Sequence, residues 1–131
     1  MRHWRILDMH GKTSATAGGI CFSWTTNGGN GAWTNWPPHE HEKDLEEVYC
    51  YFDMDDPHFG LHLSYVEPGD TYGVVAHTVK SGTMILAPRG YHPTVAAPGT
   101  RNTYLWVLAA HSHKSRRYDL AVLDPKSGEM N

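Results

Sequence analysis

The sequence predicts an all-β domain, a β-sandwich or small barrel. Short stretches with strand character recur about 8–12 residues apart, between turns rich in glycine and proline. Helix signals are poor, because the best candidate, residues 40–47, follows Pro37 and Pro38 and leads into aromatic and β-branched residues. The 131 residues are expected to form a single domain over residues 1–131, since two sizeable lobes or a TIM barrel need a longer chain.

Strands in the first half are indicated by alternation and by the turns between them. Residues 17–26 begin next to glycines and carry large apolar side chains. Residues 47–54 alternate with a period of two, and so do residues 59–66 after the turn at residues 55–57. We therefore expect the last two strands to pair as a hairpin.

Five further strands are predicted in the second half, at residues 73–79, 83–87, 91–97, 103–110 and 118–123. Pro93 interrupts the third of these. The fourth is apolar throughout, which predicts burial on both of its faces. The core of the domain is expected at residues 18–110, with a partly ordered tail at residues 111–131.

The charge and hydropathy of the chain exclude two classes of partner. The formal net charge is -3, so there is no basic excess to bind a nucleic-acid backbone. No apolar run approaches the about 20 residues of a membrane-spanning helix. The first residues lack the apolar region of a signal peptide, and a cytoplasmic location is expected.

Ten histidines are about three times the usual number for a chain of this length. His39 and His41 are two positions apart, so on an extended segment both imidazoles point the same way. A carboxylate from the next strand and His92 from a later one would complete a set of three imidazoles and one carboxylate. Such a set holds a divalent first-row metal and leaves positions open for water or substrate.

A second His-x-His pair shows that the spacing alone is weak evidence. His111 and His113 follow the apolar strand and lead into Lys114, Arg116 and Arg117. We interpret this pair as a solvated basic edge, with contact to a substrate or partner as the alternative.

Three segments, residues 33–41, 45–51 and 87–93, resemble the 5-deoxyglucuronate isomerase family of inositol catabolism. This family is related to the 5-keto-4-deoxyuronate isomerases of pectin breakdown, which residues 47–54 resemble even more. The order His-x-His, Glu, His is similar to that of the cupins. The resemblance implies a cupin-type β-sandwich or barrel, that is, a double-stranded β-helix or jelly roll.

The resemblance implies that His39, His41, Glu47 and His92 are the metal ligands. Zinc is the first expectation, with manganese, iron or nickel as alternatives. Glu46 is the alternative carboxylate, because the offset from His41 in the pectin-side family falls on it. Alternation places Glu46 on the face expected to form the core, which favours Glu47.

The resemblance covers only the C-terminal cupin half of a two-cupin family. The chain is therefore expected to be either a fragment or a stand-alone single-domain relative. A lone half exposes the surface that the other half would cover, so we expect a homodimer.

Five residues are candidates for contact with a substrate. Arg89 is suited to a sugar carboxylate, with an ordinary turn arginine as the alternative. His77 and Tyr91 are candidate proton-transfer residues, although a structural histidine and a packed aromatic are alternatives. Tyr49 and Tyr51 share the strand face of Glu47, so we expect them to line the same cavity.

The function expected from the resemblance is metal-dependent aldose–ketose isomerisation of an open-chain deoxy-uronic acid, such as 5-deoxyglucuronate. One alternative is a cupin that acts on unsaturated uronates, and another is a three-histidine oxygenase. A third is a sugar-acid or metal-binding cupin without turnover. A proton-transfer residue within reach of the substrate distinguishes the enzymes from the binding protein.

Overall fold

The computed structural model describes residues 2–7, 16–24, 33–115, 117 and 119–127 of the chain. These residues form strands and one short 3₁₀ turn, η1 (His113–Ser115). No segment in the described ranges is a helix with the length and hydropathy needed to span a lipid bilayer. The all-β prediction is therefore confirmed.

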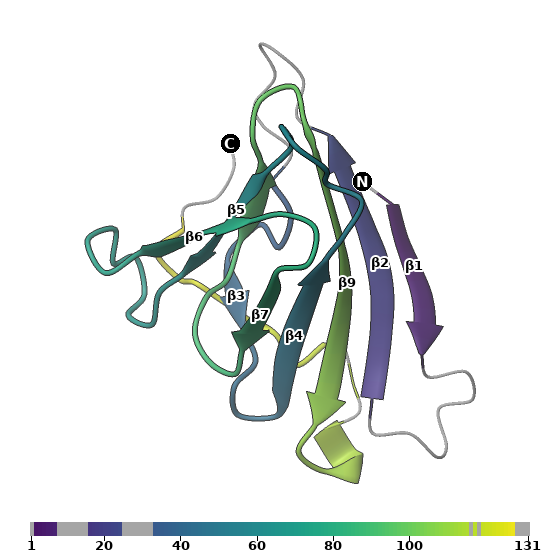
Figure 1. The fold of residues 1–131 in the computed structure, drawn as a ribbon. Helices are drawn as coiled ribbons and strands as arrows, with labels where there is room; N and C mark the ends of the chain where they lie inside the picture. Colours follow the sequence, from purple (N-terminus) through teal and green to yellow (C-terminus); the bar gives the residue numbers. More distant parts are fainter. Residues whose placement is uncertain (1, 8–15, 25–32, 116, 118, 128–131) are drawn as a thin grey trace.

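The largest of the three sheets has five strands and is antiparallel, in the order β1-β2-β9-β4-β7 (Figure 1). Its strands are β1 (Arg2–Leu7), β2 (Thr16–Trp24), β9 (Arg101–Ala110), β4 (Leu45–Tyr51) and β7 (Met84–Ala87). No strand was expected at the residues of β1.

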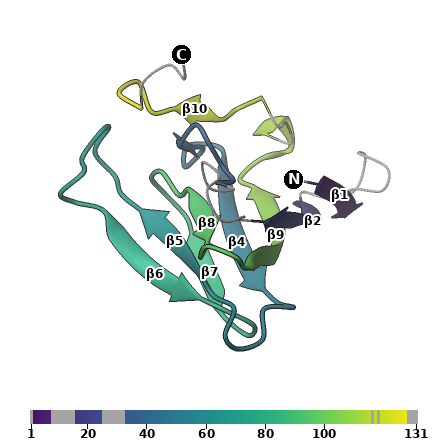
Figure 2. The ribbon, with the colours of Figure 1, turned by 90° about the horizontal axis from the view of Figure 1, so that it is seen from above.

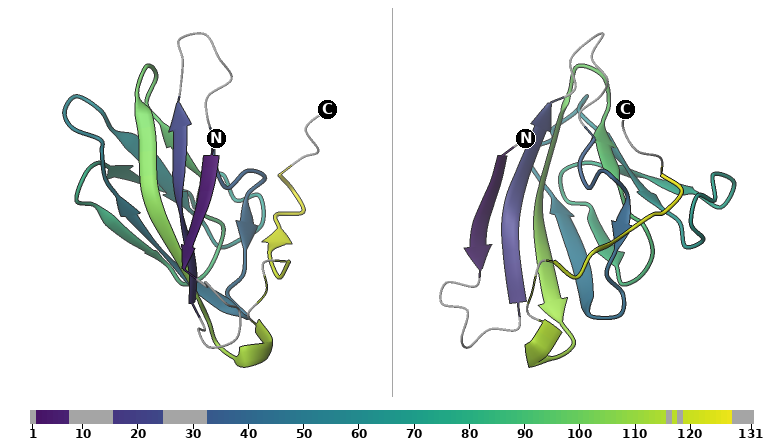
Figure 3. Two further views of the ribbon diagram at one scale, coloured as in Figure 1. Left: turned by 90° about the vertical axis from the view of Figure 1, so that its right-hand side faces the viewer. Right: turned by 180° about the vertical axis from the view of Figure 1, so that it is seen from behind.

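A three-stranded antiparallel sheet forms the second layer, in the order β6-β5-β8. Its strands are β6 (Val75–Val79), β5 (Gly60–Ser64) and β8 (Thr94–Ala96). Figure 2 shows β5 and β6 on one side of the molecule and β4 and β9 on the other. A pair of two-residue strands, β3 (His39–Glu40) and β10 (Val122–Leu123), lies on one side of the molecule, at the right in the left view of Figure 3.

The core lies between the two larger sheets. Its buried apolar and aromatic residues are Tyr49, Tyr51, Met54, Val79, Ala87 and Tyr104. On β4, Leu45, Glu47, Tyr49 and Tyr51 are buried, while Glu46 on the other face is exposed. The expectation that the Glu46 face forms the core is therefore wrong: the inner face carries the tyrosines and the glutamate.

The predicted hairpin is also wrong. β4 pairs with β9 and β7 in the larger sheet, whereas β5 pairs with β6 and β8 in the other. Alternation assigns the two faces of a strand, but it does not specify which strand lies beside it. The connection between β4 and β5 crosses from one sheet to the other.

Burial of β9 is uneven along its length. Residues 102–104 are buried, but residues 105–110 are only half-buried. The prediction of burial on both faces is wrong for this second part, because the three-stranded sheet covers only one side of the larger sheet.

Candidate metal centre and the hollows beside it

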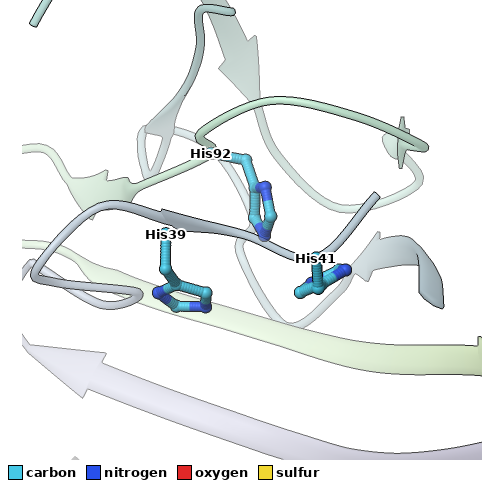
Figure 4. Close-up of side chains that lie close together, drawn as sticks. All are labelled: His39, His41 and His92. Carbon is cyan, nitrogen blue, oxygen red and sulfur yellow. The ribbon is translucent and has the colours of Figure 1, made fainter. Parts of the chain in front are cut away.

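Three histidines from two distant segments meet at one point. His39 lies in β3 and His41 just after it, while His92 lies in the loop before β8. One ring nitrogen from each lies within 4.8 Å of the others. Figure 4 shows His92 approaching from a separate segment toward the pair. The structure thus brings together the three histidines that the sequence singled out.

Each of these histidines is oriented by a backbone carbonyl. The Nδ1 atoms lie 3.1 Å from the carbonyl oxygen of Pro37 for His39, 3.3 Å from that of Leu45 for His41, and 2.8 Å from that of Gly90 for His92. A carbonyl oxygen only accepts, so each Nδ1 carries a proton and donates it. In a neutral ring with the proton on Nδ1, the Nε2 lone pair is the one that can bind a metal, the arrangement usual for metal-binding histidines.

Glu47 supplies the carboxylate beside the imidazoles. It is 8% exposed, and its Oε2 lies 3.0 Å from Nε2 of His41 and 3.1 Å from Nε2 of His92. His92 Nε2 is buried and has no aligned hydrogen-bond partner among the described residues. Three converging imidazoles and one carboxylate fit a divalent first-row metal.

The charges in this group favour an ionised carboxylate. Burial alone would raise the pKa of Glu47, but the neighbouring His41 and His92 rings outweigh it and lower the pKa to about 2. Burial lowers the pKa of His39. For His41 burial acts in the same direction, but the hydrogen bond with Glu47 overcomes it and raises the pKa.

A glycine turn places His92. Gly90 has φ of 75°, in the left-handed region that favours glycine, and a Cβ there would lie 2.5 Å from the carbonyl oxygen of Tyr65. Tyr91 exchanges backbone hydrogen bonds with Tyr65, N to O, at 2.8 and 3.1 Å. The Pro-Arg-Gly-Tyr-His string is therefore a tight turn held against Tyr65, the residue that follows β5.

Two hollows reach this group of side chains. A smaller one of about 160 Å³ is lined by residues that include His39, His41, Glu47, Trp106 and Ala121. A larger one of about 400 Å³ lies between β5, β6 and β7, and His92 is part of its wall. Ala121 belongs to the predicted tail, so the walls of the centre extend beyond residue 110.

The predicted substrate residues divide into two groups. Arg89 and His77 are exposed and line the larger hollow. Tyr91 is 5% exposed and stacks on Tyr65 with ring centroids 5.0 Å apart. The residues lining the two hollows do not include it.

Tyr49 and Tyr51 lie on the inner face of β4, as their alternation with Glu47 predicts. Both belong to the buried core, and neither lines the two hollows. The Tyr49 hydroxyl accepts a hydrogen bond from Asn35, whose side chain does line the smaller hollow. Tyr51 bonds through its hydroxyl to His62 and Thr94.

Sequence reasoning missed His62 and the tail. His62 is fully buried and lines the larger hollow. It lies opposite His77, but the sequence does not specify which strands pair, so nothing in it marked this position. The interpretation of the second histidine pair as a solvated edge agrees with the exposure of His111. The side chain of His113 lies outside the described residues.

Comparison with known proteins identifies the relatives of this chain. Residues 6–125 match the family model described as the KduI/IolB family. A 5-deoxy-glucuronate isomerase of Geobacillus kaustophilus is 36% identical over 86 residues, which covers 60% of this chain and 30% of that protein. A 4-deoxy-L-threo-5-hexosulose-uronate ketol-isomerase of Oceanobacillus iheyensis is 31% identical over 85 residues, covering 64% and 28%. These alignments cover less than a third of either relative.

Solved structures show the same fold. An IolB-like protein from Salmonella typhimurium superposes with a TM-score of 0.55 at 23% identity, covering 75% of this chain and 37% of that one. A cupin 2 conserved barrel domain protein from Salinispora arenicola superposes with a TM-score of 0.57 at 15% identity, covering 88% and 80%. The predicted cupin fold is therefore confirmed.

Proposed function

Because the chain belongs to the KduI/IolB family, we propose that it isomerises an open-chain deoxy-uronic acid between its aldose and ketose forms. This family membership confirms the resemblance found in the sequence. The observation that carries the proposal is the group of three histidines and Glu47, with a hollow on either side. The substrate we favour is 5-deoxyglucuronate.

His39, His41, His92 and Glu47 would hold a divalent ion, with zinc as the first choice and manganese, iron or nickel as alternatives. Such an ion supplies Lewis acidity that polarises the substrate carbonyl and makes the neighbouring C–H more acidic. The backbone carbonyls at each Nδ1 hold the rings in the tautomer and orientation that this role requires.

The larger hollow is suited to the rest of the substrate. Arg89 lies on its wall, and its guanidinium can bind a carboxylate through two parallel hydrogen bonds. His77 lines the same hollow, so we favour it as the residue that moves the proton between neighbouring carbons. Tyr91 packs on Tyr65, and we assign it to holding the His92 turn.

Isotope exchange tests the proposed reaction. The zinc-loaded chain is incubated with 5-deoxyglucuronate in deuterated water and followed by NMR. We expect aldose and ketose to interconvert, with deuterium appearing at the carbon beside the carbonyl, and chelation to abolish both. A folded, metal-loaded chain that converts no uronate would overturn the proposal.

A variant of Arg89 tests how the substrate is held. We expect Arg89→Gln to raise KM by about tenfold, because an exposed charge-assisted hydrogen bond is lost, and to leave the metal content unchanged. Arg117→Gln is the matched control, since Arg117 is exposed and pairs with Asp119 away from both hollows.

A second candidate is a uronate-binding cupin without turnover. It is favoured by the position of Tyr91, since this candidate proton-transfer residue lines neither hollow. Tight binding of 5-deoxyglucuronate without conversion would support it. The expected homodimer stays a prediction, which light scattering would check.

A further inference from the structure

His62 is a buried histidine next to the candidate metal centre, and neither the ligand set nor the proton-transfer role uses it. It lies in β5, opposite His77 of β6 in the strand register. Its exposed fraction is 0%, and it lines the larger hollow together with Arg89 and His92. Its ring is stacked near that of His92, with centroids 6.4 Å apart.

The hydrogen bonds behind His62 determine its tautomer. Nδ1 of His62 lies 2.8 Å from the Tyr51 hydroxyl, which lies 3.0 Å from Oγ1 of Thr94. Thr94 donates its own hydroxyl proton to the carbonyl oxygen of Leu61 at 2.9 Å, so it accepts from Tyr51. The Tyr51 proton is thus committed to Thr94, and the Tyr51 oxygen accepts from Nδ1 of His62. The neutral ring then carries its lone pair on Nε2.

This Nε2 atom is a buried acceptor without a partner. It makes no hydrogen bond among the described residues. The hydrogen bond from Nδ1 to the Tyr51 hydroxyl leaves Nε2 of the neutral ring as an acceptor. Buried polar atoms are nearly always hydrogen-bonded in native proteins, and an unpaired one calls for an explanation. A hydroxyl group in the adjoining hollow would satisfy it.

We propose that His62 is a specificity-determining residue whose Nε2 accepts a hydrogen bond from a hydroxyl group of the sugar acid. The inference rests on the proposed function, since a uronate in the larger hollow supplies hydroxyl groups as well as the carboxylate for Arg89. Tyr51 and Thr94 are positioning residues, because they keep the proton on Nδ1 of His62. A ligand that lacks the hydroxyl leaves Nε2 unpaired and binds more weakly.

Binding of deoxy analogues tests the inference. The zinc-loaded chain is titrated with 5-deoxyglucuronate and with its analogues lacking the hydroxyl at C2, C3 or C4. We expect wild type to bind one analogue about 10- to 100-fold more weakly than the parent compound, as for a buried polar group left unpaired. His62→Leu should bind that analogue and the parent equally. His58→Leu is the matched control, because His58 is half-buried in the turn before β5 and lines neither hollow.

The outcomes separate this inference from the proposed function. Unchanged discrimination in folded, metal-loaded His62→Leu would overturn the role of His62 and leave the isomerase proposal standing. Equal binding of all four compounds by wild type would also overturn the role of His62 and leave the isomerase proposal standing. Wild-type protein that binds no uronate would overturn the proposed function, and with it this inference.

A measurement on wild type avoids any dependence on how the variant folds. In protein labelled with ¹⁵N-histidine, long-range proton–nitrogen spectra report which ring nitrogen carries the proton. We expect the free protein to show His62 protonated on Nδ1, and saturation with 5-deoxyglucuronate to move the Nε2 resonance toward that of a hydrogen-bonded nitrogen. A proton on Nε2 in the free protein, or an unmoved resonance at saturation, would refute the inference.

Discussion

Leu123 and His39 are backbone partners in the antiparallel pair of β10 and β3. Asp124 extends this pairing, because its N–H donates to the carbonyl oxygen of Pro38 at 2.9 Å. In the part of the chain that the structure describes, β3 pairs with no strand other than β10. The position of His39 therefore depends on residues close to the C-terminal end of the sequence.

Truncation tests this dependence. A chain that ends at residue 120 loses β10, and we expect its zinc affinity to fall by about 10- to 100-fold, as when support of a metal ligand is lost. A chain that ends at Ser127 keeps β10 and Asp124 and serves as the control. Competition with a chromophoric chelator measures both affinities, and equal values would contradict the prediction.

Asp124 is expected to stabilise the fold. Its exposed fraction is 4%, and its carboxylate accepts hydrogen bonds from the Tyr65 hydroxyl and from the N–H groups of Gly69 and Lys126. We expect Asp124→Asn to lower the free energy of unfolding by about 1–3 kcal/mol near neutral pH. Urea denaturation measures the change, with Asp119→Asn as an exposed control.

The effect of Asp124 should depend on pH. Burial opposes ionisation, but the three donors outweigh it and hold the pKa of Asp124 below its ordinary value of 3.8. A lowered pKa in the folded state gives stabilisation that is present above the unfolded value and is lost as the pH falls through the folded one. The difference between wild type and Asp124→Asn should therefore shrink as the pH falls below the unfolded value of about 3.9. A constant difference down to acid pH would contradict this account.

Metal content should depend on His41 and not on His111. We expect about one divalent ion per wild-type chain, since three imidazoles and a carboxylate complete one site. His41→Ala removes one ligand and should lose most of the ion, while His111→Ala changes an exposed ring and should keep it. Elemental analysis of the purified proteins measures their metal content. Equal loss of metal from both variants would refute the ligand set.

The two neighbouring glutamates should differ in their effect on the metal. Glu47 is buried against His41 and His92, whereas Glu46 is exposed on the opposite face of β4. We expect Glu47→Gln to weaken zinc binding and Glu46→Gln to leave it unchanged. Zinc titration of both variants tests this, and weakening by Glu46→Gln alone would make Glu46 the ligand.

The sequence predicted which side chains meet at the centre better than it predicted the strand pairing. The spacing of His39 and His41 predicted a shared direction because side chains two apart on an extended segment point the same way. Alternation also predicted that Glu47, Tyr49 and Tyr51 share a face. It could not show that this face is the inner one, because Val48 and Cys50 on the other face are more apolar than a glutamate.

Two features of the structure lacked a usable local signal. β10 is two residues long, too short for alternation to reveal, and its pairing with β3 is set by tertiary contacts. The role of His62 depends on Tyr51 and Thr94, which are distant in sequence and come from two different sheets. The three side chains meet only in the folded protein.

The candidate metal ligands are divided among separate sheets, and this has a consequence for folding kinetics. Glu47 comes from the larger sheet, His39 from the two-stranded pair, and His92 from the loop that leads into β8. Contacts between such distant segments form slowly, because long loops must close before the contacts stabilise the chain. An unfolded chain therefore offers a metal only scattered ligands, and the complete set exists only after the sheets have docked. The rate of zinc uptake during refolding would therefore report the docking of the sheets, the last step of assembly, and not the formation of the folding nucleus.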